Sequence, residues 1–154
     1  MKKPFSLQPL IDLAQHQNDS ATHKLGQLNK QQQNAQSKLD MLQQYRKDYQ
    51  ARLQEATRNG INPAELRNFQ EFINKLDEAI SQQFKLVGQS KDSTQAGRGE
   101  FNTAQRKLKT FDTLHQRHIE IQKKIVRKSE QHASDEHTSR SSTYQAINAE
   151  VPNK

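Results

Sequence analysis

The sequence predicts an all-α fold in which two long helices form an antiparallel coiled-coil hairpin over residues 1–128, followed by a disordered C-terminal tail over residues 129–154. Only 31% of the 154 residues are hydrophobic and 6% are aromatic, whereas an ordinary globular domain has about 45–50% apolar residues. Such a chain is either disordered or has a thin core between two helices. Apolar residues recur with a period of about 3.5 on both sides of a turn signal, which favours the two-helix core.

The first helix is predicted over about residues 7–58, because two rows of residues, each with a step of seven, run through this segment. One row is apolar at every step, and the second alternates between apolar and polar residues. Polar residues in a seam weaken it but restrict its register. The apolar row is Leu7, Ala14, Ala21, Leu28, Ala35, Leu42, Tyr49 and Ala56, and the alternating row is Ile11, Asn18, Leu25, Gln32, Leu39, Arg46 and Leu53.

A loop is predicted at residues 59–62, where signals for the end of one helix and the start of another follow each other. Gly60 suits the left-handed conformation that ends a helix. Asn62 is a good N-cap, Pro63 fits the first helical position, and Glu65 can complete a capping box. A connection this short makes the two helices antiparallel neighbours.

The second helix is predicted over about residues 63–128. Gly88, Gly97 and Gly99 do not interrupt its register, so we expect one helix that each glycine weakens by about 1 kcal/mol relative to alanine. Ser, Thr, His and Asn dominate from about residue 129, which predicts the disordered tail. The seam rows are Leu66, Ile73, Ile80, Val87, Thr94, Phe101 and Leu108, and Phe69, Leu76, Gln83, Ser90, Gly97, Ala104 and Phe111.

Aromatic residues widen the apolar stripe close to the loop. For a turn centred between residues 60 and 61, the numbers of facing residues add up to about 121, so Tyr49 is expected to face Phe72, and Tyr45 to face Leu76. Tyr45, Phe72 and Ala79 each precede a seam position by one residue and therefore lie on its flank. Exposed aromatic residues are typical of protein-binding surfaces. The alternative is that these rings only seal the end of a thin core.

Positive charge is concentrated towards the end of the second predicted helix. Residues 101–128 carry eight Lys or Arg and two Asp or Glu residues, within a chain of net charge +7. This basic cluster can attract an acidic protein, nucleic acid or an anionic membrane, or it can be a solvated face that aids solubility. The basic cluster consists of Arg106, Lys107, Lys109, Arg117, Lys123, Lys124, Arg127 and Lys128.

The residues that an enzyme or a cofactor site needs do not occur together. The absence of cysteine excludes disulfides, zinc knuckles and thiol nucleophiles. His115 and His118 have the spacing to share a metal ion, but no further ligand accompanies them, so we interpret them as weak seam positions. We therefore expect no catalytic residue, no cofactor and no metal. No run of about 18 apolar residues occurs and no signal peptide follows Met1, so we expect a cytoplasmic protein.

Three segments resemble the FliJ family of bacterial flagellar export proteins. They are residues 5–14 (FSLQPLIDLA), residues 42–49 (LQQYRKDY) and residues 68–76 (NFQEFINKL). The likeness extends over about residues 5–128 and includes the lengths of the helices and the place of the loop. Heptads resemble one another, so the combination of tyrosines, loop and Phe-Gln-x-Phe-Ile carries the resemblance rather than any single motif.

The resemblance implies a coiled coil similar to the central stalk of rotary ATP synthases. Its partners would be the hexameric flagellar export ATPase, the cytoplasmic linker of the export gate, and empty substrate chaperones that it exchanges. It would be cytoplasmic and peripherally associated with the inner membrane at the flagellar base through protein contacts. The basic cluster becomes a candidate docking site for the ATPase. The family's gate-binding positions correspond to Leu42, Tyr45, Tyr49, Phe72, Leu76 and Ala79.

The leading hypothesis is thus a stalk that links the ATPase ring to the gate and catalyses nothing itself. The alternative is a basic coiled coil that binds nucleic acid or acts as a scaffold, whose affinity would fall steeply with salt. A helix lying on a membrane surface is disfavoured, because the partner helix already covers the apolar seam.

Overall fold

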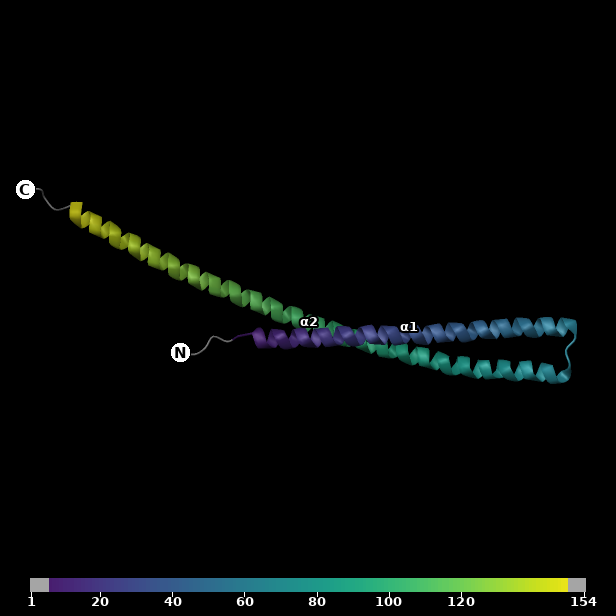
Figure 1. Ribbon diagram of the computed structural model, residues 1–154. Coiled ribbons are helices and arrows are strands. Elements are labelled where there is room, and N and C mark those ends of the chain that lie inside the picture. The colour runs from purple at the N-terminus through teal and green to yellow at the C-terminus, as the bar shows by residue number, and fades with distance from the viewer. Residues whose placement is uncertain (1–5, 150–154) are drawn as a thin grey trace, which may run out of the picture. The chain divides into compact units, whose positions relative to one another are not determined.

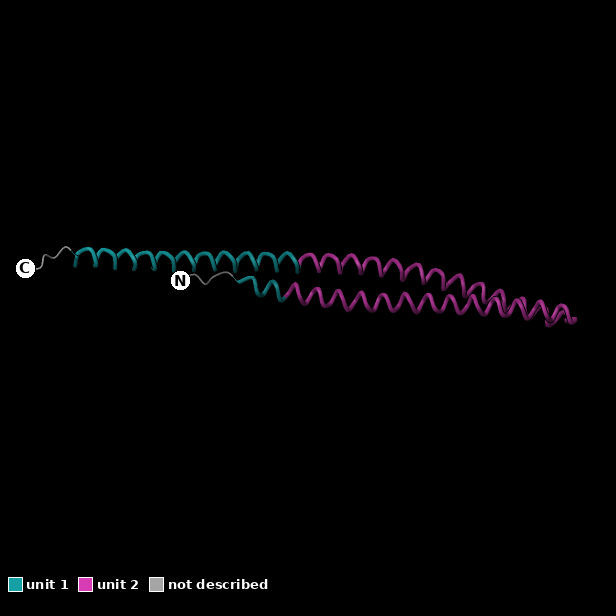
Figure 2. The backbone as a smooth tube through the Cα atoms, turned by 90° about the horizontal axis from the view of Figure 1, so that it is seen from above, with its two compact units in different colours: residues 1–12, 108–154 teal, residues 13–107 magenta. Residues whose placement is uncertain are grey.

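The computed structural model describes residues 6–149, which form two helices and no strand. Helix α1 spans Gln8–Asn59 and helix α2 spans Pro63–Ala149 (Figure 1). The chain divides into two compact units (Figure 2). Unit 2 is Leu13–Lys107, and unit 1 joins Met1–Asp12 to Leu108–Lys154. Two long helices packed against each other confirm the predicted all-α class.

Unit 2 is an antiparallel helical hairpin, whose two arms lie side by side and are joined by residues 60–62 (Figures 1 and 2). Every residue of the four predicted seam rows between positions 13 and 107 is buried or half-buried. The most deeply buried apolar residues are Ala14, Leu39, Leu76 and Val87. The core is therefore one layer thick, as a chain with so few apolar residues requires.

Backbone conformation and capping explain the loop. Gly60 has a backbone φ of 88°, a conformation that residues other than glycine rarely adopt. The backbone N–H of Glu65 donates to Oδ1 of Asn62 over 2.9 Å, so Asn62 caps α2 as predicted. Pro63 is the first residue of α2, where its missing N–H costs no helical hydrogen bond.

Three features of the seam hold the arms of unit 2 close together. Gln83 Nε2 donates to the carbonyl oxygen of Ala35 over 2.9 Å, and Thr94 Oγ1 donates to that of Leu28 over 3.3 Å. Gly97 is buried, and a Cβ atom there would lie 2.5 Å from Cδ1 of Leu28. Helix α2 is continuous through Gly97. This glycine, expected only to weaken the helix, thus also permits a close approach to α1.

Unit 1 contains the start of α1 and the part of α2 that follows Lys107. The predicted seam residues Leu108 and Phe111 are half-buried, and so are His115, His118 and Ile119. From residue 120 to residue 149, every residue of α2 is exposed. The helix therefore continues well beyond the last residue that packs against anything in the described chain.

The structure differs from the predicted disordered tail, because residues 129–149 are helical. Composition suggested disorder, but no Gly or Pro interrupts this segment, and its polar side chains bond along the helix. Gln131 donates to Asp135 over 3.1 Å, and the Thr138 hydroxyl donates to the carbonyl of Ser134 over 2.9 Å. A Gln–Asp pair four residues apart stabilises a helix, and the Thr138 bond satisfies that hydroxyl within the helix. The predicted tail residues 150–154 lie outside the described range.

Candidate functional site

The aromatic surface beside the loop arises from the seam register. Tyr49 occupies a seam position of α1, and its ring centroid lies 4.3 Å from that of Phe72 and 5.4 Å from that of Phe69, both on α2. The predicted proximity of Tyr49 and Phe72 is therefore confirmed. Aromatic pairs at such distances contribute about 0.5–1.5 kcal/mol beyond the area they bury. The cluster both joins the arms and presents ring surface.

The six residues predicted to bind the export gate differ in accessibility. Tyr45 and Phe72 are 53% and 41% exposed. Leu42, Tyr49 and Ala79 are half-buried, whereas Leu76 is only 7% exposed. Tyr45, Tyr49 and Phe72 thus supply the surface that a partner can contact. Leu76 lies in the core between the arms.

A hollow of about 290 Å³ lies in this surface. It is lined by Tyr45, Asp48, Tyr49, Arg52 and Phe72. The guanidinium carbon of Arg52 lies 5.9 Å from the centroid of the Tyr49 ring, within range of a cation–π interaction. The hollow therefore combines aromatic walls with one acidic and one basic group. This combination suits an apolar side chain that is flanked by polar or charged groups.

Sequence reasoning missed Asp48 and Arg52, although their spacing carried the signal. Both residues lie three positions after a tyrosine of the site, and residues three apart share one face of a helix. A search for charged residues at these offsets from Tyr45 and Tyr49 would have found them.

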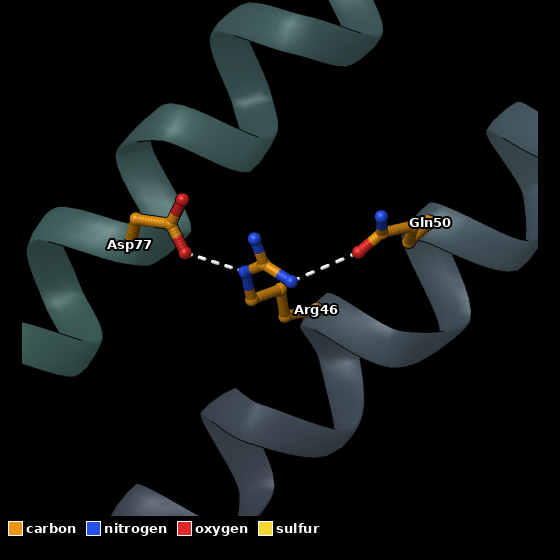
Figure 3. A network of polar contacts seen from close by, with 3 residues as sticks. All are labelled: Arg46, Gln50 and Asp77. Carbon is orange, nitrogen blue, oxygen red and sulfur yellow. Dashed lines mark hydrogen bonds and ion pairs between the residues drawn. The ribbon is translucent and has the colours of Figure 1, made fainter.

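An ion pair links the two arms next to the aromatic surface (Figure 3). The side chain of Arg46, at a seam position of α1, donates from Nε to Oδ1 of Asp77 on α2, and from Nη1 to Oε1 of Gln50 over 2.9 Å. The hydrogen bond that Arg46 donates to Asp77, together with the negative charge of this carboxylate, raises the pKa of Arg46. Arg46 is therefore charged throughout the physiological range, and the pair favours the register that places Tyr49 beside Phe72.

The residues of the basic cluster are all exposed, and they belong to both units. Arg106 and Lys107 lie in unit 2. At about 100° per residue, the six members in unit 1 fall within an arc of about 140° on α2, opposite the seam residues Leu108 and Phe111. Those six are Lys109, Arg117, Lys123, Lys124, Arg127 and Lys128. In unit 1 the positive charge thus gathers on one face of the helix.

A further hollow in unit 2, of about 510 Å³, lies where the seam carries small residues. Its lining includes Ala21 and Ala104, and the ion pair between Lys24 and Glu100, 3.0 Å apart, borders it. The short alanine side chains leave this space between the arms. Lys107 and several polar residues complete the lining, so the hollow combines an apolar floor with polar and basic groups.

The two seam histidines make few polar contacts. His115 Nδ1 is buried without a hydrogen-bond partner, and His118 Nε2 lies 3.2 Å from Nε2 of Gln122. Within residues 6–149, no three His, Cys, Asp or Glu residues are grouped so as to hold a metal ion. The described part of the chain also has no helix that is long and apolar enough to cross a membrane.

Comparison with known proteins identifies the family. The family described as "Flagellar FliJ protein" matches residues 2–146 of the chain. The chain belongs to the FliJ family. The FliJ protein of Salmonella typhi is 29% identical over 117 residues, which cover 76% of this chain and 80% of that protein. The FliJ protein of Escherichia coli (strain K12) is 27% identical with the same coverage. No solved structure gives a significant match. The predicted family is thus confirmed, and the chain is a flagellar protein.

Proposed function

We propose that this FliJ-family protein is a cytoplasmic stalk of the flagellar type III export apparatus. It links the hexameric export ATPase to the cytoplasmic linker of the export gate, and it helps to recycle empty substrate chaperones. The protein performs this role through contacts with other proteins and hydrolyses nothing itself. One observation carries the proposal: the rings of Tyr45, Tyr49 and Phe72 form a partly exposed surface around one hollow. The resemblance implies that the family binds the gate at these positions.

The gate-binding role follows from the physical character of this surface. Tyr and Phe rings that are partly exposed beside a rigid helical pair bury much apolar area on binding, at a small cost in side-chain entropy. The ring contacts of Tyr49 with Phe69 and Phe72 hold these three side chains in place before a partner arrives. The hollow beside them provides a place for an apolar side chain of the gate linker.

The ATPase-docking role uses the basic cluster. Long lysine and arginine side chains that gather on one face of a helix attract an acidic rim or pore, and they raise the rate of association. Contacts with the gate and the ATPase would keep the protein peripheral to the inner membrane at the flagellar base.

The gate assignment is tested by replacing the exposed rings. Binding to the purified gate linker should fall by at least about tenfold in a Tyr45→Ala, Tyr49→Ala, Phe72→Ala triple variant, because hot-spot aromatic residues each contribute about 2 kcal/mol or more. Swimming motility of cells that carry the variant should fall with it. Phe84→Ala is the matched control, since Phe84 is an exposed phenylalanine of unit 2 outside the hollow. Equal binding by the triple variant and the wild-type chain, with helicity intact, would remove the assignment.

The basic face also favours a second candidate function, nucleic-acid binding. This function predicts an affinity that falls steeply with salt and does not depend on Tyr45 or Tyr49. An electrophoretic shift of double-stranded DNA by the triple variant, at physiological salt and equal to that by the wild-type chain, would support it over the stalk.

A further inference from the structure

Helix α2 has a second apolar stripe, which begins before the last half-buried residue of the helix, Ile119, and continues beyond it. Leu114, Ile121, Ile125 and Val126 are all more than 40% exposed, and Ile119 is the last half-buried residue of the helix. In the described chain nothing covers these side chains. Ile119 and Val126 also line a hollow of about 380 Å³, together with Gln122, Lys123 and Arg127.

The spacing of this stripe is that of a coiled-coil seam. Positions 114, 118, 121 and 125 follow one another at intervals of four, three and four, which keeps them on one face of a helix. At about 100° per residue, the apolar residues span an arc of about 160°, with His118 and Gln122 at its centre. An arc this wide is broad enough to cover a neighbouring helix.

Basic residues border the stripe on both sides. Arg117, Lys124 and Lys128 lie beyond the edge formed by Leu114, Ile121 and Ile125, and Lys123 lies beyond the edge formed by Ile119 and Val126. Arg127 starts further round the helix, about 20° from Glu120, but it lines the same hollow as Ile119 and Val126. Glu120, the one acidic residue between positions 114 and 128, lies on the opposite face. The positions that flank a coiled-coil seam select the partner by charge. This seam therefore selects against basic partners and favours acidic ones.

We infer that residues 114–126 of α2 bind an acidic amphipathic helix of another protein, whose apolar stripe packs on Leu114, Ile121, Ile125 and Val126 and whose flanking carboxylates meet the basic residues. A second copy of this chain would bring the same positive flanks together. A membrane is disfavoured, because His118 and Gln122 lie at the centre of the stripe and no Trp, Tyr or Phe occurs in residues 112–126. The inference rests on the proposed docking role of the basic cluster, and it adds that the partner binds through an acidic helix.

The test uses the full chain and a synthetic helical peptide of about four heptads, with Leu at the seam positions and Glu at the flanking positions. The same peptide with Lys at the flanking positions is the matched control. Calorimetry should show that the acidic peptide binds at least about tenfold more tightly than the basic one. Amides of residues 114–128 should exchange hydrogen more slowly when the acidic peptide is bound.

Variants of the apolar residues test whether the stripe itself, and not only the basic residues beside it, binds the peptide. The double variant Ile121→Gln, Ile125→Gln should bind the acidic peptide at least about tenfold more weakly. Ile147→Gln should bind like the wild-type chain, because Ile147 is an equally exposed isoleucine of α2 outside the stripe. Peptide binding that is unchanged in the double variant would overturn the inference. Failure of the acidic peptide to bind would also overturn the inference if the stripe had another occupant. That occupant would be a second copy, seen as a dimer in sedimentation, or a membrane, seen as binding to phosphatidylglycerol vesicles. In either case the double variant would abolish the dimer or the vesicle binding.

Binding to the purified export ATPase distinguishes a failure of this inference from a failure of the proposed function. Loss of ATPase binding in Lys124→Gln, Lys128→Gln together with normal ATPase binding in Ile121→Gln, Ile125→Gln would retain docking by charge and overturn the second seam. Normal ATPase binding in both variants, with the acidic peptide still bound through the stripe, would overturn the docking role and leave the seam for another acidic partner. Loss of ATPase binding in both variants supports the two together.

Discussion

Two stretches of α2 differ in what holds them helical. Between Pro63 and Lys107 the helix packs on α1, with Leu76, Val87 and Thr94 buried along the seam. Between residues 120 and 149 every residue is exposed, and the observed side-chain bonds join residues four apart in the same helix. Isolated helices are marginal in water even when their sequences favour them. The first stretch therefore owes its helix to packing, and the second owes it to local interactions alone.

One continuous helix can therefore contain two stretches that differ in stability against local unfolding. The packed stretch should open only when the hairpin unfolds, whereas the exposed stretch should open on its own. A stretch that opens readily is also the one whose order a partner can change, which agrees with the inferred binding of residues 114–126 to another helix.

The largest expected effect comes from removing a packed side chain. Leu39→Ala should lower the free energy of unfolding by about 2–5 kcal/mol, because the leucine is 4% exposed and its loss leaves a cavity between the arms. Ile125→Ala should change it by less than about 0.5 kcal/mol, because Ile125 is exposed. Thermal unfolding followed by circular dichroism measures both. Similar losses in the two variants would contradict the contrast between the stretches.

A smaller loss of stability is expected when a side chain is added at Gly97, where the two arms approach closely. Gly97→Val should lower the free energy of unfolding by about 1–3 kcal/mol, because the new side chain forces Leu28 to move. Gly99→Ala should raise it by about 0.5–1 kcal/mol, since nothing lies within 4 Å of a Cβ atom there and alanine favours the helix. Urea unfolding compares them. A stabilising Gly97→Val would show that the arms do not need this contact.

Hydrogen exchange sharpens the comparison without a mutation. Backbone amides of residues 120–149 should exchange at least about tenfold faster than those of residues 70–100, because local opening needs no separation of the arms. Mass spectrometry of peptides from the two stretches measures the ratio. Equal protection would mean that residues 120–149 are covered in solution.

The smallest effect is expected at the Arg46–Asp77 ion pair, which is solvent-exposed. Because the pKa of Arg46 is raised, the stabilisation is fully present below the ordinary arginine value and is lost only as the pH rises through the raised one. Salt, rather than pH near neutrality, should therefore weaken the pair. Arg46→Gln should lower the Tm by no more than about 2 °C at low salt and by less at 1 M salt. A larger loss at high salt would contradict an electrostatic origin.

The seam could be predicted from the sequence because it depends on short-range periodicity. A seam of period about 3.5 fixes which residues face inward as soon as the turn near Gly60 fixes the direction of the second helix. The contact between Tyr49 and Phe72 follows from these two facts. The exposed rings of the candidate site were predictable for the same reason, since Tyr45 and Phe72 stand one position off the seam.

The remaining features depend on distances that periodicity does not supply. The close contact between Gly97 and Leu28 requires the separation of the arms, and the pairing of Arg46 with Asp77 requires the reach of two particular side chains. The helix over residues 129–149 was missed because its composition suggests disorder, although the segment has no Gly or Pro and its Gln131–Asp135 pair favours a helix.

The polar bonds across the seam have a mechanical consequence. Gln83 and Thr94 donate to backbone carbonyls of α1, and a carbonyl recurs at every residue of that helix. These two bonds could re-form after a slip by one heptad, so they resist separation of the arms more than sliding. The fit of Gly97 against Leu28 and the pairing of Arg46 with Asp77 depend on particular side chains and cannot re-form in this way. Under a load along the helix axis, these two contacts should therefore oppose sliding of the arms, whereas the two polar bonds should not.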